Sequence, residues 1–156
     1  MSMPVVAFLE GVGSDASGRT VSDILERNDA WLEHEHDFIQ WLFPLCEASE
    51  QVEGAPILSE DEVVHIRASR AAQDNLRRAT ARMLAFYRDN DHWLRSMDHN
   101  HLRITRMLKS VRLLVSLDEA VRLYDILMER VHEAGDPIAS RNLRYWSDAV
   151  GLSYGV

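Results

Sequence analysis

The stretch ITRMLKSVRLLV, Ile104–Val115, decides the fold class from the sequence. Its apolar side chains recur every three or four residues, at Ile104, Met107, Leu108, Val111, Leu114 and Val115. This spacing puts them on one face of an α-helix, because a helix turns once in about 3.6 residues. A half-buried strand would instead alternate apolar and polar side chains. We therefore predict an amphipathic helix that packs against the core.

The same spacing recurs elsewhere in the chain. It is present at Val21–Leu25, Val63–Tyr87, Val121–Val131 and Leu143–Val150. A strand is suggested only at Val5–Leu9, which is short. With a further helix expected at Trp31–Phe43, the sequence predicts an all-α fold, a single compact bundle of about six helices.

Helix boundaries are marked by local signals. A capping box is a hydroxyl followed three residues later by a carboxylate, and each end satisfies a backbone N–H group. This pattern is present at Thr20–Asp23, Ser59–Glu62 and Ser116–Glu119. Asp136-Pro137 predicts a further start, with Gly135 ending the preceding helix. We expect the long helix that begins after Ser59 to break near Ser69.

Composition bounds the class of protein. The chain has 156 residues, of which 46% are hydrophobic and 27% charged, and no apolar run is long enough to span a bilayer. We expect one domain over residues 1–156, located in the cytoplasm. The net charge of −8 argues against broad nucleic-acid binding, although sixteen of the seventeen basic residues are arginine. The single cysteine, Cys46, excludes an internal disulfide and is expected to be a small buried filler.

The second expected helix, Trp31–Phe43, contains the stretch HDFIQWLFP. On a helical wheel its apolar side chains cover an arc of about 200°, which predicts a central, largely buried helix. His36 and Gln40 are four residues apart on the remaining polar strip, and Pro44 ends the helix. These two side chains either lie at the margin of the core, where they bond backbone or water, or line a ligand-binding pocket.

The stretch LEHEHDFIQWLFP, Leu32–Pro44, resembles the signature of the conserved N-terminal region of the opioid growth factor receptor. Further blocks follow in the family's order: APIL at 55–58, MLAFY at 83–87, HNHLRITRMLKS at 99–110 and, more loosely, SRNLRYWSDAV at 140–150. Arg88 stands where the family commonly has glycine. The resemblance implies a receptor-like binding module with no established enzymatic activity. Vertebrate members are described as binding the pentapeptide Met-enkephalin and as associated with the nuclear envelope. This chain looks like a stand-alone, microbial-type member, and those properties are not carried over to it.

The candidate ligand-binding residues come from two segments. His36, Gln40 and Trp41 form one group, and Asn100, Arg103 and Arg106, near the start of the helix that contains Ile104–Val115, form the other. Arginines near the positive end of a helix dipole suit an anion, so the expected ligand is a peptide or a small anionic molecule. The alternative for the arginines is a solvated surface.

The same residues are compatible with two other functions. The alternatives to a binding module are an enzyme that uses His36 as general acid or base, and a nucleic-acid-binding helical domain; the oligomeric state stays open. We assign no catalytic residue, cofactor or metal. The histidine pairs His34/His36 and His99/His101 are two residues apart and point to opposite sides of a helix. In the loop before Thr20, Asp15 and Arg19 are expected to pair.

Overall fold

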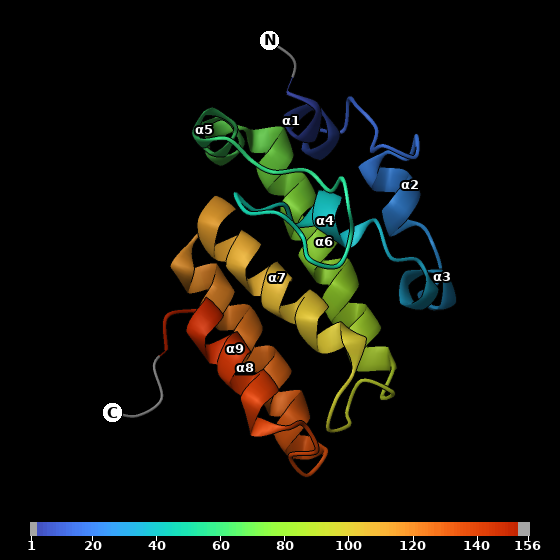
Figure 1. The fold of residues 1–156 in the computed structure, drawn as a ribbon, viewed down its shortest axis with the longest axis vertical. Coiled ribbons are helices and arrows are strands. Elements are labelled where there is room, and N and C mark those ends of the chain that lie inside the picture. The colour runs from blue at the N-terminus through green and yellow to red at the C-terminus, as the bar shows by residue number, and fades with distance from the viewer. Residues whose placement is uncertain (1–2, 153–156) are drawn as a thin grey trace. The chain divides into compact units, whose positions relative to one another are not determined.

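The computed structural model describes residues 3–152, and these form nine α-helices and no strand (Figure 1). The only extended pairing among them is an isolated bridge between Leu45 and Ile57. The all-α prediction is therefore confirmed, with nine helices in place of the expected six or so. No helix in residues 3–152 combines the length and the apolar character needed to cross a membrane.

The chain divides into two compact units, and the boundary lies between Arg82 and Met83, inside helix α6 (Arg70–Asp89). The first unit also contains α1 (Pro4–Leu9), α2 (Val21–Leu25), α3 (Asp29–His34), α4 (Ile39–Leu42) and α5 (Glu60–Ala68). The second unit contains α7 (His99–Leu114), α8 (Leu117–Glu133) and α9 (Ser140–Ala149). The extent of a single domain over residues 1–156 stays a prediction.

The capping signals place three helix starts correctly. Thr20 and Ser59 each form a complete capping box, at the starts of α2 and α5. At α8, Ser116 accepts a hydrogen bond from the backbone N–H of Glu119 at 3.0 Å. These local bonds satisfy N–H groups that have no partner within the helix, so the sequence alone locates these starts.

The prediction of a helix start at Asp136-Pro137 is wrong, because α9 begins at Ser140. Gly135 ends α8 in the left-handed conformation, with φ of +85°. Its N–H bonds the carbonyl of His132, and the N–H of Asp136 bonds the carbonyl of Val131, both at 3.0 Å. This pair of bonds is a Schellman motif. Asp136 therefore completes the end of one helix and does not begin the next.

Residues Val5–Leu9, whose pattern was too short to support a strand, form helix α1. Pro4 occupies the first turn, where its fixed φ favours a helix and its missing N–H costs nothing. Val5, Val6, Phe8 and Leu9 are all buried, which is the i, i+1, i+3, i+4 pattern of a helical face. Helix α1 packs against α4 and α5 within the first unit.

The expected break at Ser69 is confirmed, since α5 ends at Ala68 and α6 begins at Arg70. Ser69 has an extended backbone, with ψ of 113°. Its hydroxyl accepts from the N–H of Ala72 at 3.2 Å and donates to the carboxylate of Glu10 at 2.7 Å. The serine thus starts α6 and ties it to the residue that follows α1.

In the second unit, α7 packs against both α8 and α9 (Figure 1). Helices α7 and α9 run in the same direction, because Asn142 bonds His101 near their starts and Arg112 bonds the carbonyl of Ala149 near their ends. The predicted stripe of Ile104, Met107, Leu108, Val111 and Leu114 is buried along α7.

Candidate functional site

The segment Trp31–Phe43 is not one helix, contrary to the prediction. Helix α3 ends at His34, Glu35 is extended with ψ of 140°, and α4 begins at Ile39. The rings of Trp31 and Phe38 lie 5.1 Å apart between centroids. In a continuous helix residues seven positions apart would be separated by about 10.5 Å along the axis. The break therefore allows Trp31 to pack on Phe38, a contact that the straight helix would forbid.

Because of this break, His36 and Gln40 do not share a polar strip. His36 lies between the two helices and is exposed, whereas Gln40 is on α4 and only 5% exposed. The predicted stop is correct: Phe43 has left the helical conformation, with φ of −129° and ψ of 69°, immediately before Pro44.

The side-chain carbonyl of Gln40 is the unusual polar group of this segment. Its Oε1 atom is buried and has no hydrogen-bond partner. Next along the chain, Trp41 is half-buried and packs edge-on against Phe8, with ring centroids 5.5 Å apart. A buried acceptor without a donor costs about 1–3 kcal/mol, so the first unit holds one polar atom that its own fold leaves unsatisfied.

A charged network in the first unit was only partly predicted. Asp15 and Arg19 form the expected ion pair at 2.8 Å, and Arg19 also binds Asp37 at 2.7 Å. The guanidinium groups of Arg19 and Arg27 each lie 5.3 Å from the ring centroid of Trp31. Burial opposes ionisation of Asp37, but its bonds to Arg19 and Ser17 hold its pKa below the ordinary value. The contact of Arg19 with Trp31 was not predicted, because these residues are twelve positions apart; Arg27 is only four positions from Trp31.

Cys46 is exposed, so its prediction as a buried filler is wrong. Partial burial of the thiol raises its pKa, and the nearby carboxylates of Glu60, Glu47 and Glu62 raise it further. The neutral thiol is therefore favoured, whereas a nucleophilic cysteine needs a lowered pKa.

The second group of predicted residues lies on α7. Asn100 is fully buried, Arg103 is buried and Arg106 is half-buried. The amide of Asn100 accepts from the hydroxyl of Tyr87 at 3.3 Å and donates to Asp98 at 2.9 Å. The side chain of Asn100 is therefore part of the core of the second unit.

The start of α7 already carries an anion, the carboxylate of Asp98. This carboxylate accepts from the backbone N–H of Asn100 at 2.9 Å and binds Arg95 at 2.9 Å. Burial alone would raise the pKa of Asp98, but the two bonds from Asn100 and the charges of His99 and Arg95 lower it below the ordinary value. An external anion at this helix start would have to compete with Asp98.

A buried cluster of His101, Trp93 and Trp146 in the second unit was missed by the sequence predictions. His101 is 2% exposed, and its ring lies edge-on to Trp146, with centroids 5.8 Å apart. The indole N–H of Trp146 donates to the carbonyl of His101 at 3.0 Å, and that of Trp93 donates to the carbonyls of Tyr87 and Asn90. A signal for this burial existed, because His101 lies three residues before Ile104 and seven before Leu108 on the apolar face.

The predicted site residues thus fall into two groups of three. His36, Gln40 and Trp41 belong to the first unit, and Asn100, Arg103 and Arg106 belong to the second. The union of these groups into one ligand site stays a prediction.

The model of the opioid growth factor receptor conserved region matches residues 14–91, which is half of the chain. The chain belongs to the opioid growth factor receptor conserved-region family. The resemblance that Leu32–Pro44 suggested is therefore confirmed. The matched residues include His36, Gln40 and Trp41, but end before Asn100, Arg103 and Arg106.

Among individual proteins, the chain is similar to the opioid growth factor receptors of Rattus norvegicus, Mus musculus and Homo sapiens. It is 35% identical to each over 116 residues, which covers 61% of this chain. The match covers 20%, 18% and 17% of these receptors, so the chain spans about a fifth of their length. No solved structure matches the chain significantly.

Proposed function

We propose that this chain is a binding module that recognises a peptide through His36, Gln40 and Trp41. The observation that supports it best is the buried Oε1 atom of Gln40, which has no hydrogen-bond partner. Buried polar groups in native proteins are nearly always hydrogen-bonded, and exceptions often mark a function or an absent ligand. A ligand that donates an N–H to this atom would remove the cost.

The chemistry of Gln40 favours a peptide over an anion. A carbonyl oxygen accepts hydrogen bonds, and a fully ionised anion has no proton to donate. A peptide carries backbone N–H groups, and in this proposal the half-buried Trp41 and the exposed His36 of the same segment supply further contacts. The net charge of −8 also disfavours an anionic ligand at long range.

Arg103 and Arg106 remain candidate contacts for an anionic ligand of the second unit, whereas the side chain of Asn100 lies in the core of that unit. The chemistry of these two arginines supports this role, since guanidinium groups pair well with carboxylate and phosphate. The name of the relatives, opioid growth factor receptor, suggests an opioid peptide as the first ligand to test. We also propose a cytoplasmic location for this module.

The test uses thermal denaturation of the whole chain with a panel of short peptides that includes Met-enkephalin. A peptide that binds the folded state raises the melting temperature of the wild-type protein. The variant Gln40→Met keeps the length of the side chain but removes the acceptor. We expect this variant to be as stable as the wild type or more stable, and to lose the shift that the peptide causes.

A matched control is Gln73→Met, because the Nε2 atom of Gln73 donates to the carbonyl of Ile66 at 3.0 Å. This variant should lower the melting temperature and keep the peptide-induced shift. The proposal fails if Gln40→Met keeps the shift, or if inorganic phosphate stabilises the protein and no peptide of the panel does. Loss of a phosphate-induced shift in Arg106→Gln would support a separate anion-binding role for Arg106, and persistence of the shift would exclude that role.

A further inference from the structure

Charge is divided unevenly among the helices of the second unit. Helices α7 and α9 together contain six basic residues and one acidic residue, Asp148. Helix α8 contains five acidic and two basic residues. The unit as a whole has ten residues of each sign, so its overall neutrality hides an excess of basic residues on α7 and α9.

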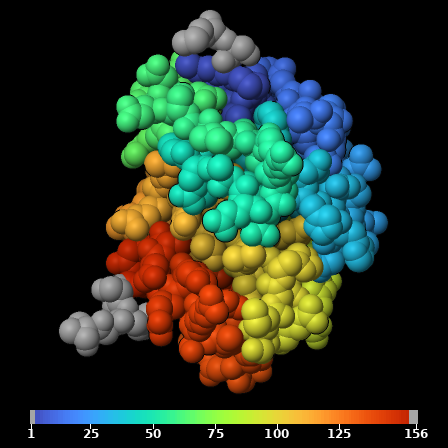
Figure 2. All heavy atoms as spheres, viewed as in Figure 1, coloured from blue at the N-terminus to red at the C-terminus, as the bar shows by residue number. Residues whose placement is uncertain are grey.

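Helix α9 presents two of these basic residues, Arg141 and Arg144, to solvent. Arg141, Arg144, Tyr145 and Asp148 are exposed and follow the i, i+3, i+4, i+7 spacing of one helical face. The opposite face, with Trp146 and Ala149, is buried. In Figure 2 the orange-red atoms of α9 lie on the visible surface of the second unit.

The two arginines of α9 form no ion pair with any described residue in the range 3–152. By contrast, Arg122 on α8 binds Glu119 at 2.6 Å. Asp148 lies one turn from Arg144 on the same face but forms no ion pair with it, so the guanidinium groups of Arg141 and Arg144 are available to an external acidic group.

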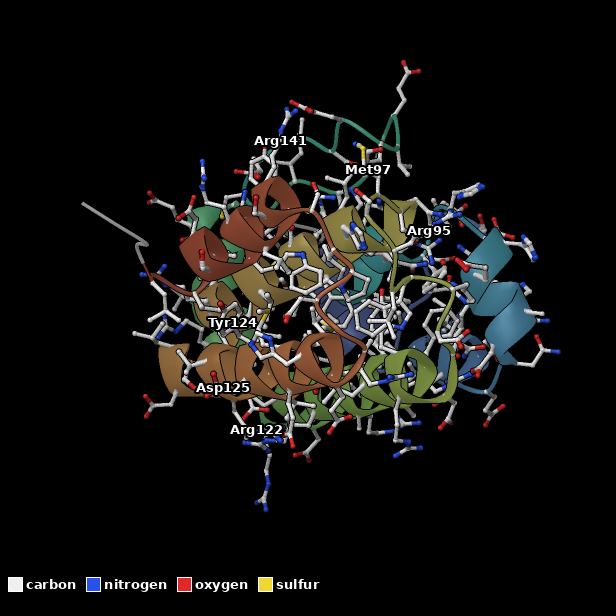
Figure 3. All side chains as sticks on the ribbon, turned by 90° about the horizontal axis from the view of Figure 1, so that it is seen from below. Arg95, Met97, Arg122, Tyr124, Asp125 and Arg141 are labelled. Carbon is white, nitrogen blue, oxygen red and sulfur yellow. The ribbon has the colours of Figure 1, made fainter. Side chains whose placement is uncertain are left out.

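The loop before α7 extends this surface. The carbonyl of Ser96 accepts from the N–H of Ala139 at 3.1 Å and from the side-chain amide of Asn142 at 3.4 Å. These bonds hold Ser96 at the start of α9, and so place Arg95 and Met97, which flank it in the chain, near the same helix end. Met97 is 72% exposed, so its side chain is available for contact. Figure 3 shows Arg95, Met97 and Arg141 along one edge of the second unit, away from Arg122 and Asp125 of α8.

We propose that this arginine face, defined by Arg95, Met97, Arg141, Arg144 and Tyr145, binds an acidic peptide segment of a partner protein. The guanidinium groups of Arg141 and Arg144 pair with carboxylates in a planar, two-pronged geometry, while that of Arg95 already binds Asp98 and borders the face. Met97 and Tyr145 provide apolar contacts of the kind enriched at protein interfaces. The occupant is therefore a segment with glutamate or aspartate on both sides of an apolar residue.

The distribution of charge favours this occupant over nucleic acid. The first unit has seven basic and fifteen acidic residues, so it carries the whole net charge of −8. Such a charge repels a long polyanion much more strongly than a short segment with a few carboxylates. Asp148 on the same face of α9 also interrupts any continuous track for phosphates.

The experiment measures fluorescence anisotropy of a fluorescein-labelled peptide, Glu-Glu-Leu-Phe-Glu-Glu, titrated with the whole protein. The variants Arg141→Glu and Arg144→Glu should each weaken binding by about tenfold, because a close attraction becomes a repulsion. The matched control, Arg122→Glu, makes the same change of charge on α8 and should leave the affinity within about twofold. Added salt should weaken binding by the wild-type protein.

Two further measurements keep the proposal falsifiable. Thermal melts check that each variant folds, and Gln40→Met should bind the acidic peptide as the wild type does, which separates this surface from the proposed peptide site. Equal affinity of Arg141→Glu, Arg144→Glu and the wild type would overturn the proposal. It would also be overturned if a single-stranded DNA oligonucleotide bound the same arginines more tightly than the peptide.

Discussion

The imidazole Nδ1 atom of His101 lies 2.9 Å from the side-chain amide nitrogen of Asn142, and its Nε2 atom lies 2.8 Å from the carbonyl oxygen of Trp93. A carbonyl only accepts and an amide N–H₂ only donates. The ring is therefore neutral, with its proton on Nε2. Burial is the main cause that lowers the pKa of His101, and the bond to Trp93 and the charge of Asp98 oppose it in part.

This geometry predicts that acid destabilises the second unit. The pKa of His101 is lower in the folded state than in the unfolded chain, so the unfolded chain takes up the proton first. The stability due to the neutral ring is complete above the ordinary pKa of about 6.5 and is lost as the pH falls toward the folded value. Urea denaturation at a series of pH values between 7.5 and 5 should show a falling free energy of unfolding.

His101→Gln provides the control, because glutamine does not titrate. The free energy of unfolding of this variant should depend less steeply on pH over the same range. An unchanged slope would mean that other groups cause the pH dependence.

Removal of the cap at the start of α7 should destabilise the protein. The carboxylate of Asp98 binds the N–H and the amide of Asn100, and its side chain is 2% exposed. We expect Asp98→Ala to cost about 1–2 kcal/mol in chemical denaturation. Asp98→Asn keeps an oxygen acceptor and should cost less, whereas Asp125→Ala on the exposed face of α8 should cost almost nothing. Equal effects of all three changes would contradict the capping role.

A β-carbon at Gly135 should also be costly, because this residue has φ of +85°. Nothing lies within 4 Å of the position of an added Cβ, so the cost is conformational and not steric. Gly135→Ala should lower the free energy of unfolding by about 1 kcal/mol. Gly135→Asn should lower it less, because asparagine tolerates the left-handed region. If alanine is neutral, the Schellman motif does not need glycine.

Removal of the Asp15 carboxylate should cost more stability than removal of the Asp37 carboxylate. The side chain of Asp15 is fully buried and accepts the backbone N–H groups of Ser17 and Arg19, both at 2.9 Å, while that of Asp37 is 41% exposed. Asp15→Ala leaves a mostly buried guanidinium with one partner fewer and should cost about 3 kcal/mol. Asp37→Ala should cost about 1 kcal/mol or less in the same urea titration. A larger loss for Asp37→Ala would reverse this ranking.

The sequence predicts a helix start or end correctly where local bonds of one residue with its near neighbours form it. Thr20, Ser59 and Ser116 each bond a backbone N–H three residues away, and Ser69 separates two helices through its own extended backbone. Such bonds form within one turn of chain, so their pattern is visible in a linear sequence. The buried stripe of α7 followed in the same way from the helical period.

The candidate site followed less well. Gln40 and Trp41 were predicted as candidate ligand-binding residues, and the pairing of Asp15 with Arg19 was predicted correctly. The prediction of one helix over Trp31–Phe43, however, joined α3 and α4. At the break, Arg19 and Ser17 bind Asp37, and the ring of Trp31 packs on that of Phe38. Contacts between residues eighteen or twenty positions apart are not visible in the helical periodicity of the sequence. A prediction that uses only that periodicity therefore gives a continuous helix.

The sequence by itself determined that this protein is all-helical, where several of its helices begin, and to which family it belongs. Those properties depend on apolar period, on capping side chains and on one distinctive stretch. Only the tertiary structure decided that His36 is exposed while Gln40 is buried with an unsatisfied oxygen, and that His101 lies neutral between Asn142 and Trp93. The reason is that burial and hydrogen bonding of a polar side chain depend on which distant elements pack around it, and local chain geometry does not specify those elements.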